Sequence, residues 1–281
     1  MSRRSTRLVS PAVEALRTID DWGARVAAAG VVDTDRVVAQ HGPAAVELRW
    51  ASITKLLTGL AVLVAVEEGT VDLDEAAGPE GSTLRHLLSH ASGLPPDEGA
   101  PLQPPGRRRI YSNRGIELAA SLVGDRAGME FGDYFRASVV VPLGLAGTLR
   151  GSPAWGYRGP LGDLLALGRE LLAPTLVSAE TLGEATAVQF LGLVGVLPGW
   201  GRMEPNDWGL AFELRDGKSP HWTSARNSPR TFGHFGAAGT FLWVDPELGA
   251  ACGVLTDKEF GDWAVAAWPR FNDAVVTELL R

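Results

Sequence analysis

The stretch that most limits how this chain can fold is RWASITKLLTGLAVLVAVEEG, residues 49–69. Its residues 56–66 are apolar except for Thr58 and Gly59. A helix that is apolar on nearly all sides belongs in a protein core, and this run is too short to span a bilayer. Lys55 nevertheless stands at the start of the helix. The fold therefore has to bury an amine at the mouth of a core helix.

The choice of lysine at this position is itself informative. Only three of the 26 basic residues are lysines, namely Lys55, Lys218 and Lys258, and all others are arginines. An arginine keeps its proton inside a protein, whereas a desolvated lysine can lose it. A lysine at the buried helix start therefore indicates that a neutral amine is useful there.

Length, charge and cysteine content exclude several classes of protein. The 281 residues are enough for one domain or for two lobes with a full core. The net charge of −7 argues against a nucleic-acid binder, which usually carries a basic stripe. The single cysteine, Cys252, lies in the apolar segment GAACGVL and is expected to be a small buried side chain. Nothing in the sequence therefore requires an oxidising compartment.

The N-terminus contains a pattern that imitates an export signal. Paired arginines in SRRSTRL, residues 2–8, fit a twin-arginine signal only if an apolar segment follows. The next segment, VSPAVEALRTIDDW, is instead charged at regular intervals and predicts an amphipathic helix. We therefore expect a soluble, cytoplasmic protein without a membrane partner.

The order of the predicted elements indicates an α+β fold. Helical spacing is found near residues 11–29, 52–69, 115–127, 131–139, 161–172, 179–187 and 262–280. Strand patterns are found in VVDTDRVVAQHG, AVELRW, WGLAFEL, TFGHFG, GTFLWVD and GAACGVLT, and residues 97–109 form a loop. Strands thus lie at both ends of the chain and helices in the middle.

We interpret this order as one domain, residues 1–281, made of two lobes. Both chain ends form one antiparallel sheet flanked by the terminal helices, at about residues 1–80 and 205–281. An all-helical lobe covers about residues 81–204. A cleft between two such lobes is a usual place for a small-molecule site.

Ser52 and Lys55 carry the first candidate chemistry. They are three residues apart and share one helical face at the helix N-terminus. Free backbone N–H groups and the helix dipole favour an anion there, such as the oxyanion of an acyl-transfer intermediate. A desolvated Lys55 can accept the serine proton. Taken alone, the short pattern is more often a serine cap and a lysine that reaches for solvent.

Two further motifs end that isolation. Y-S-N stands at residues 111–113 and H-F-G at residues 234–236, in an order that varies the S-x-x-K, S-D-N, K-T-G set of penicillin-recognising serine enzymes. The segments LRHLLSHASGLP, GTVDLDE, PLGLAGT, LVSAETLGEAT and DWGLAFEL agree with the habits of the same family. From about residue 30 onward the chain resembles the serine β-lactamase and penicillin-binding-protein superfamily. It is most similar to the branch of class C β-lactamases, D-alanyl-D-alanine carboxypeptidases and related esterases.

The resemblance implies a role for each motif residue. Ser52 would be the nucleophile, and Lys55 would share the role of base with Tyr111, held as a phenolate by nearby cations. Asn113 would bind Lys55 and the acyl side chain of the substrate. His234 would replace the lysine of the third motif, orienting Tyr111 or meeting the leaving group. The oxyanion hole would consist of the backbone N–H groups of Ser52 and Ala237, and Gly236 would let the strand approach the substrate.

Phe235 bears on the choice of substrate. Relatives that act on β-lactams or D-alanyl peptides use a hydroxyl at this position for the substrate carboxylate, and Phe235 has none. If the ring lies beside the nucleophile, small uncharged esters are favoured; if it points into the core, it touches no substrate. The resemblance thus implies a serine hydrolase on small esters or amides, most simply a carboxylesterase. A β-lactamase or D-amino-acid peptidase, and a catalytically silent binding protein, remain as alternatives.

Other candidates weigh less. His86 and His90 have the spacing of a two-histidine zinc face, but no accompanying glutamate or third ligand is evident, so no metal and no cofactor is expected. His221 lies in a polar loop and is either a surface residue or part of the cleft rim. Residues 188–201 form either a buried connection or a flap with Trp200 over an acyl pocket. The remaining tryptophans that can wall the cleft are Trp155, Trp208 and Trp222. The sequence specifies no oligomeric state.

Overall fold

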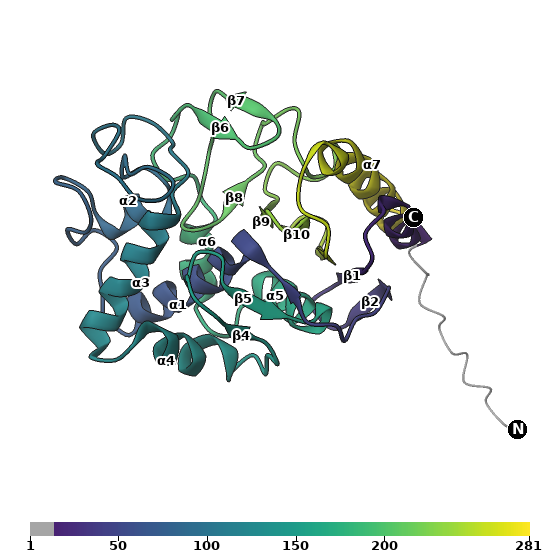
Figure 1. The fold of residues 1–281 in the computed structure, drawn as a ribbon, viewed down its shortest axis with the longest axis horizontal. Coiled ribbons are helices and arrows are strands. Elements are labelled where there is room, and N and C mark those ends of the chain that lie inside the picture. The colour runs from purple at the N-terminus through teal and green to yellow at the C-terminus, as the bar shows by residue number, and fades with distance from the viewer. Residues whose placement is uncertain (1–13) are drawn as a thin grey trace, which may run out of the picture.

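A six-stranded antiparallel sheet forms the centre of the molecule. The structure, a computed structural model, describes residues 14–281 (Figure 1). The strands follow the order β2-β1-β11-β10-β9-β8. Their bounds are β1 Ala27–Val32, β2 Val37–His41, β8 Glu213–Leu214, β9 Phe232–Gly236, β10 Thr240–Asp245 and β11 Ala250–Thr256. The prediction of one antiparallel sheet built by both chain ends is therefore confirmed.

Helices cover both faces of this sheet. The 3₁₀ helix η1, Glu14–Trp22, and the C-terminal helix α7, Asp262–Leu279, pack on one face and on each other. The other face is covered by α5, Leu161–Leu172, which contacts β1, β10 and β11 (Figure 1). Although α5 falls within the residues assigned to the helical lobe, its apolar side chains are buried against the sheet. Cys252 on β11 is buried in the layer between the sheet and α7.

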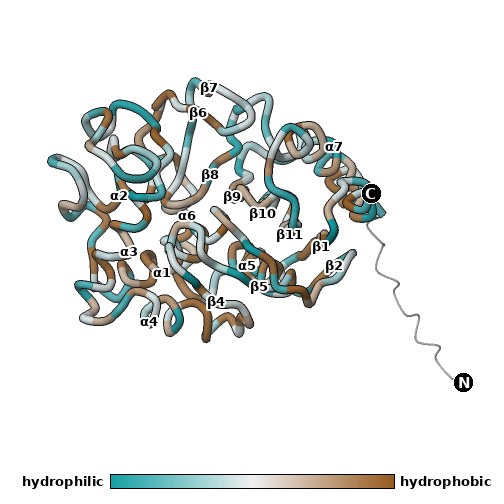
Figure 2. The backbone as a smooth tube through the Cα atoms, viewed as in Figure 1, coloured by the Kyte–Doolittle hydropathy of each residue, from teal (hydrophilic) through white to brown (hydrophobic). Residues whose placement is uncertain are grey.

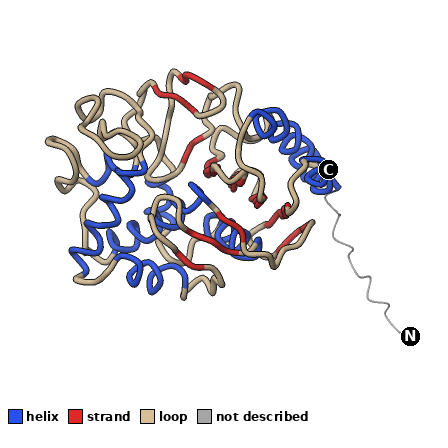
Figure 3. Tube along the Cα trace, viewed as in Figure 1, coloured by secondary structure: helices blue, strands red, loops and turns tan. Residues whose placement is uncertain are grey.

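The remaining helices gather beside the sheet (Figure 3). They are α1 Thr54–Glu67, α2 Leu84–Leu88, α3 Asn113–Ala127, α4 Phe131–Phe135, the π-helical turn η3 Arg136–Val140, and α6 Ala179–Ala185. The core helix α1 is buried along nearly its whole length, as its apolar sequence requires (Figure 2). It ends where predicted, because Gly69 adopts a left-handed conformation with φ +70°.

The middle of the chain is less purely helical than the sequence predicts. A three-stranded sheet joins β3 Leu48–Arg49, β5 Tyr157–Gly159 and β4 Thr148–Leu149, and a hairpin joins β6 Gly195–Leu197 to β7 Gly201–Met203. Strands of two or three residues are too short to show a period of two in the sequence. For the same reason the strand predicted at WGLAFEL is realised only in β8.

Two predictions fall partly or wholly beyond the described residues. The paired arginines of residues 2–8 and the first part of the predicted N-terminal helix lie outside residues 14–281. The described part of that helix is η1, which ends at Trp22, and β1 begins at Ala27 instead of a helix continuing to residue 29. Across residues 14–281, no helix combines the length and apolar character needed to cross a membrane.

Candidate active site

Ser52 lies at a sharp turn between a strand and the core helix. After β3 the chain passes through Ala51, whose φ of +48° is a left-handed conformation that costs a non-glycine residue roughly 1–2 kcal/mol. The turn is held at Trp50, whose backbone N–H donates to the Tyr157 carbonyl at 3.0 Å. The Trp50 carbonyl in turn accepts from the Thr240 hydroxyl at 2.9 Å. Ser52 is therefore presented on a fixed turn, η2 Ala51–Ile53, that leads directly into α1.

Lys55 is fully buried and is surrounded by neutral oxygens. Its Nζ lies 2.7 Å from Asn113 Oδ1, 2.9 Å from the Ala154 carbonyl oxygen and 3.2 Å from Ser52 Oγ. The two carbonyl-type oxygens can only accept, so they take two N–H donors. When the amine is neutral, its lone pair is then left for the Ser52 hydroxyl. This arrangement suits an amine that removes a proton from Ser52.

The electrostatic surroundings agree with that arrangement. Burial lowers the pKa of Lys55 to about 7, although the carboxylates of Glu117 and Asp97 act in the opposite direction. Close to pH 7 a substantial share of the molecules therefore carries a neutral amine. A lysine at this buried helix start can therefore supply a neutral amine, because Lys55 is desolvated and no carboxylate of the described residues contacts its Nζ.

Tyr111 contacts the same serine oxygen from another direction. Its hydroxyl lies 2.8 Å from Ser52 Oγ, and Lys55 Nζ lies 4.7 Å from its ring centroid. Burial raises the pKa of Tyr111 well above its ordinary value. Burial thus favours the phenol in the resting site and opposes the phenolate that the resemblance implies. A protonated Tyr111 is placed to donate a proton.

The third motif brings His234 beside Tyr111. The two ring centroids are 5.8 Å apart, but within the described chain His234 Nε2 has no hydrogen-bond partner. The other ring nitrogen, Nδ1, lies 2.6 Å from the Phe235 carbonyl oxygen and therefore carries the proton of the neutral ring. Burial, with a smaller effect of Lys55, lowers the pKa of His234 to about 3. His234 is thus a neutral group that packs against Tyr111.

Phe235 takes the second of the two placements left open by the sequence. Adjacent residues of a strand point to opposite faces, and the Phe235 ring packs with Trp200, Trp222 and Trp268 at centroid distances of 5.5–5.8 Å. It belongs to the hydrophobic cluster under α7. The expected substrate contact of Phe235 therefore has no support in the geometry.

Gly236 has a packing role that the sequence did not indicate. A Cβ at Gly236 would lie 2.5 Å from the Trp50 carbonyl oxygen and 3.0 Å from Ala51 Cβ. Only glycine lets the end of β9 approach the backbone just before Ser52 this closely. The close approach is thus to the nucleophile turn, and it brings the exposed Ala237 next to that turn. The expected oxyanion pair, the N–H groups of Ser52 and Ala237, lies on these two adjoining segments.

Asn113 is the first residue of α3, after the cap Ser112, whose hydroxyl accepts from the Gly115 N–H. Its amide oxygen accepts from Lys55, and its amide nitrogen donates to Asp97 Oδ1 at 3.1 Å. The structure thus brings Ser52, Lys55, Tyr111 and Asn113 into one hydrogen-bonded group.

Trp208, one of the tryptophans expected at the cleft, lies beside Tyr111 with ring centroids 5.9 Å apart. His90, considered in the sequence only as a metal ligand, lies beside the same ring at 4.6 Å.

Sequence reasoning missed two further residues around the hydrogen-bonded group. Ala154 contributes only its carbonyl, so no side-chain signal marks it. The sequence indicates Asp97 only as the start of the 97–109 loop. The available signal was its position just after the segment that ends in Gly-Leu-Pro, because Pro95 of that segment bonds to Ser112, the cap of α3.

The other histidine candidates have structural partners. His86 Nδ1 bonds to Thr83, and His90 Nδ1 accepts from the Ser112 N–H. His221 is buried, and its Nε2 lies 3.0 Å from Glu213. It therefore lies neither at the surface nor at the cleft rim. In the described part of the chain, no group of three or more His, Cys, Asp or Glu side chains is arranged to hold a metal.

Residues 188–201 combine the two interpretations left open. Trp200 packs in the cluster around Phe235, as a buried connection would. Val196 and Pro198 of the same segment line a hollow of about 380 Å³ whose opposite wall includes Leu102 and Tyr111. The hairpin therefore both supports the core and borders the space beside Tyr111. Of the two other tryptophans considered for the cleft, Trp155 is exposed and Trp222 is buried in the cluster under α7.

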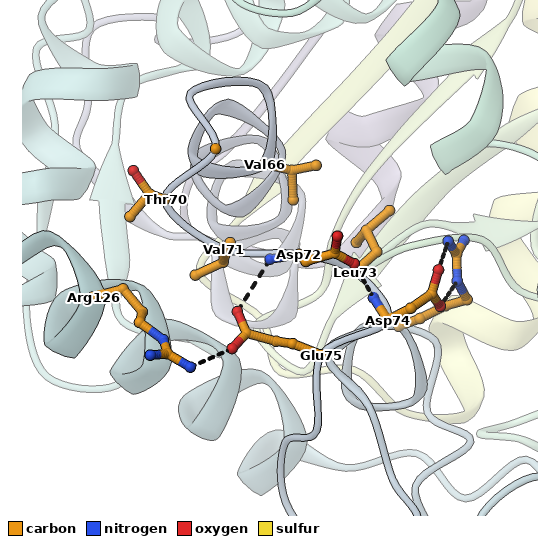
Figure 4. A pocket seen from close by; sticks show the side chains of 10 residues that line it. Val66, Thr70, Val71, Asp72, Leu73, Asp74, Glu75 and Arg126 are labelled. Carbon is orange, nitrogen blue, oxygen red and sulfur yellow. Dashed lines mark hydrogen bonds and ion pairs between the residues drawn. The ribbon is translucent and has the colours of Figure 1, made fainter.

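A larger hollow, of about 520 Å³, lies at the end of α1 and contains none of the motif residues (Figure 4). Four of its charged side chains form two ion pairs. Arg85 bonds to Asp74 at 2.8 Å and Arg126 to Glu75 at 2.5 Å. The hollow therefore lies apart from the hydrogen-bonded group around Ser52.

Comparisons with known proteins agree with this fold. The family model "Beta-lactamase" matches residues 15–276. A beta-lactamase from Mycobacterium bovis is 49% identical, with a TM-score of 0.92, over 94% of this chain and 99% of that one. Simvastatin synthase from Aspergillus terreus is 16% identical with a TM-score of 0.74 over 95% of this chain and 96% of that one, a likeness of fold. Penicillin-binding protein 4* from Bacillus subtilis is 26% identical over 34% of this chain, and the match spans only 28% of that protein.

Proposed function

Because the chain belongs to the beta-lactamase family, we propose that it is a serine hydrolase that forms an acyl intermediate on Ser52. One observation carries the proposal: Ser52 Oγ is contacted both by a buried amine, Lys55, and by a half-buried phenol, Tyr111. A serine with only a structural role would not need both a base and a proton donor at its hydroxyl oxygen.

The geometry supports the following sequence of proton transfers. Neutral Lys55 removes the proton of Ser52 as Oγ attacks the carbonyl carbon of the substrate. The backbone N–H groups of Ser52 and Ala237 bind the resulting oxyanion. Tyr111, a phenol in the resting site, donates a proton to the leaving oxygen or nitrogen. The Lys55 ammonium then returns its proton to the Tyr111 phenolate. A water molecule attacks the acyl-serine while neutral Lys55 takes its proton, and the departing Ser52 Oγ recovers that proton from Lys55.

Among possible substrates, we favour uncharged carboxylic esters. The third motif carries a neutral His234 in place of a lysine. A substrate carboxylate placed beside His234 would lose water without gaining a cationic partner, which is costly. An ester without a charge avoids this cost. The preference thus rests on the neutrality of His234, because the Phe235 ring lies in the cluster under α7.

The second candidate is a β-lactamase, favoured by the 49% identity to a protein described as a beta-lactamase. The ratio of kcat/KM for a short-chain nitrophenyl ester to kcat/KM for nitrocefin separates the two. We expect the ester to be favoured by at least about a hundredfold, comparable to leaving a buried charge unpaired. A ratio in favour of nitrocefin contradicts the esterase proposal and leaves the acyl-serine proposal intact.

A fluorophosphonate label tests the acyl-serine step itself. We expect one adduct by intact mass, which peptide mapping places on Ser52, and none in Ser52→Ala. Ser89 and Ser112 are internal controls because both are buried and bound to backbone carbonyls. Folded protein that forms no adduct would instead be a silent binding protein.

A further inference from the structure

Asp97 is an exposed carboxylate at the edge of the Ser52 group. It follows Pro95 and Pro96, which are fixed to the start of α3. The Pro95 carbonyl accepts from the Ser112 hydroxyl at 2.7 Å, and the Pro96 carbonyl accepts from the Asn113 N–H at 2.7 Å. The loop that carries Asp97 is therefore held at the helix N-terminus, where a carboxylate is also favoured by the helix dipole.

The bond between Asp97 and Asn113 restricts the orientation of the amide. An asparagine amide has one accepting oxygen and one donating nitrogen. Asp97 can only accept, so it binds the nitrogen at 3.1 Å and leaves the oxygen for Lys55 Nζ at 2.7 Å. Rotation of the amide by half a turn would bring two like-polarised pairs into contact. Asp97 thus selects the amide orientation that holds Lys55.

The charge of Asp97 also acts on Lys55. The charged and titratable groups around Lys55 come from the 97–109 loop (Asp97), from α3 (Glu117), from the segment after α2 (His90), from the second motif (Tyr111) and from β9 (His234). Burial lowers the pKa of both histidines, and burial raises that of Tyr111, so these three are neutral near pH 7. Only two carboxylates remain to favour the protonated amine.

We propose that Asp97 is a positioning residue of the active site, which acts through the Asn113 amide to hold Lys55 in place and to favour its protonated form. The proposal rests on the proposed function, since it assigns Asp97 a part in the base chemistry of Ser52. It assigns the residue two separable effects, one on orientation and one on charge.

Two substitutions separate these effects. Asp97→Asn removes the charge but keeps an oxygen that can accept from Asn113, whereas Asp97→Ala removes both. Glu98→Gln is the matched control, because it removes an equal charge from the adjacent exposed position. The rate of Ser52 phosphonylation by a fluorophosphonate, measured from pH 5 to 10, reports the base without knowledge of the substrate.

We expect the acidic limb of this profile to move to lower pH in Asp97→Asn and in Asp97→Ala, by on the order of half a pH unit. Only Asp97→Ala should also lower the plateau at high pH, by roughly tenfold, because the amide is no longer oriented. Glu98→Gln should overlay the unmodified protein. Profiles of both Asp97 variants that overlay it, or a limb that moves as far in Glu98→Gln, would overturn the proposal.

The small number of lysines allows a readout that needs no activity. With ¹³Cε-labelled lysine, the three lysines give three NMR signals, and Lys55→Arg identifies that of Lys55. The titration midpoint of Lys55 should fall in Asp97→Asn and stay constant in Glu98→Gln. A protein that forms no adduct at Ser52 but shows this shift would refute the proposed function and keep the Asp97–Lys55 coupling. An adduct without the shift would refute the role of Asp97 alone.

Discussion

Two of the three lysines, Lys55 and Lys218, are buried, and their surroundings differ in one respect. Lys218 contacts the carboxylate of Glu213 and donates to the Asp207 carbonyl at 2.7 Å. Glu213 also accepts from the Trp222 indole at 2.9 Å and bonds to His221. The Nζ of Lys55, in contrast, has only neutral oxygens around it.

The comparison shows what turns a buried lysine into a base. An adjacent carboxylate keeps an ammonium group charged and fixes it as part of the structure. Neutral acceptors hold the amine in place without opposing the loss of its proton. Lys218 has the first environment and Lys55 the second, although both side chains are almost free of solvent contact.

The largest expected effect breaks the comparison at Lys55. Lys55→Arg keeps a positive charge but removes the group that can lose a proton, so we expect the rate of ester hydrolysis to fall on the order of 10⁴-fold. Lys218→Met is the matched change in the other environment and should keep the rate per folded molecule within a few-fold. Circular dichroism would check that both variants fold. Near-normal turnover of Lys55→Arg would make Lys55 a structural residue.

The second expected effect concerns the free energy of unfolding, which we expect to depend more on Lys218 than on Lys55. Lys218→Met leaves the buried Glu213 carboxylate without its cation, which costs about 3–5 kcal/mol of the free energy of unfolding at pH 7.5. Urea denaturation measures this loss.

The same cluster predicts a response to acid. Burial alone would raise the pKa of Glu213, but Lys218 and His221 lower it to about 2. A lowered carboxylate pKa gives stability that is present above pH 4.5 and is lost as the pH falls toward 2. Lys218→Met should flatten this dependence, and an unchanged acid limb would show that the ion pair contributes nothing.

The third prediction concerns how the free energy of unfolding changes above pH 7, which depends on Lys55. Its pKa falls from 10.5 in the unfolded chain to about 7 in the folded one, so the unfolded chain binds more protons between these values. The free energy of unfolding therefore rises with pH in this window, by about 2–3 kcal/mol between pH 7 and 9. Lys55→Met should lack this rise. We would compare the two proteins by urea denaturation at both pH values; parallel curves would mean that Lys55 stays charged.

The sequence predicts the sheet and the core helix well because their signals are local and long. The strand patterns at both chain ends, the apolar run of α1 and the stop at Gly69 each depend on several neighbouring residues. The short strands β4 to β7 depend on pairing with other segments, which no window of the sequence reports. The position of α5 on the sheet likewise follows from packing and not from its helical pattern.

In the active site, the motif spacing correctly groups Ser52, Lys55, Tyr111 and Asn113, because the resemblance supplies their pairing in space. It does not report burial or side-chain directions. The burial that opposes a phenolate at Tyr111 depends on the enclosing rings of Trp208 and His90. These contacts form only in the folded chain.

The smallest expected effect sharpens the comparison from the side of Glu117. This carboxylate is the counterpart of Glu213, but it reaches Lys55 only through intervening groups. Glu117 Oε1 accepts from the Ser152 hydroxyl at 2.5 Å, and the Ala154 N–H donates to that same hydroxyl at 3.0 Å, while the Ala154 carbonyl accepts from Lys55. Glu117→Gln keeps an acceptor for Ser152 and removes the charge.

Because Glu117 raises the pKa of Lys55 against the effect of burial, its neutralisation should lower that pKa. The base is active without its proton, so the acidic limb of the pH–rate profile should move to lower pH by up to about one unit. Activity near pH 6 should then rise several-fold, while the plateau above pH 8 stays within about twofold. Stopped-flow hydrolysis of a nitrophenyl ester across this range measures both. A limb that moves to higher pH, or a plateau that collapses, would show that Glu117 acts on Ser52 by contact and not through the field at Lys55.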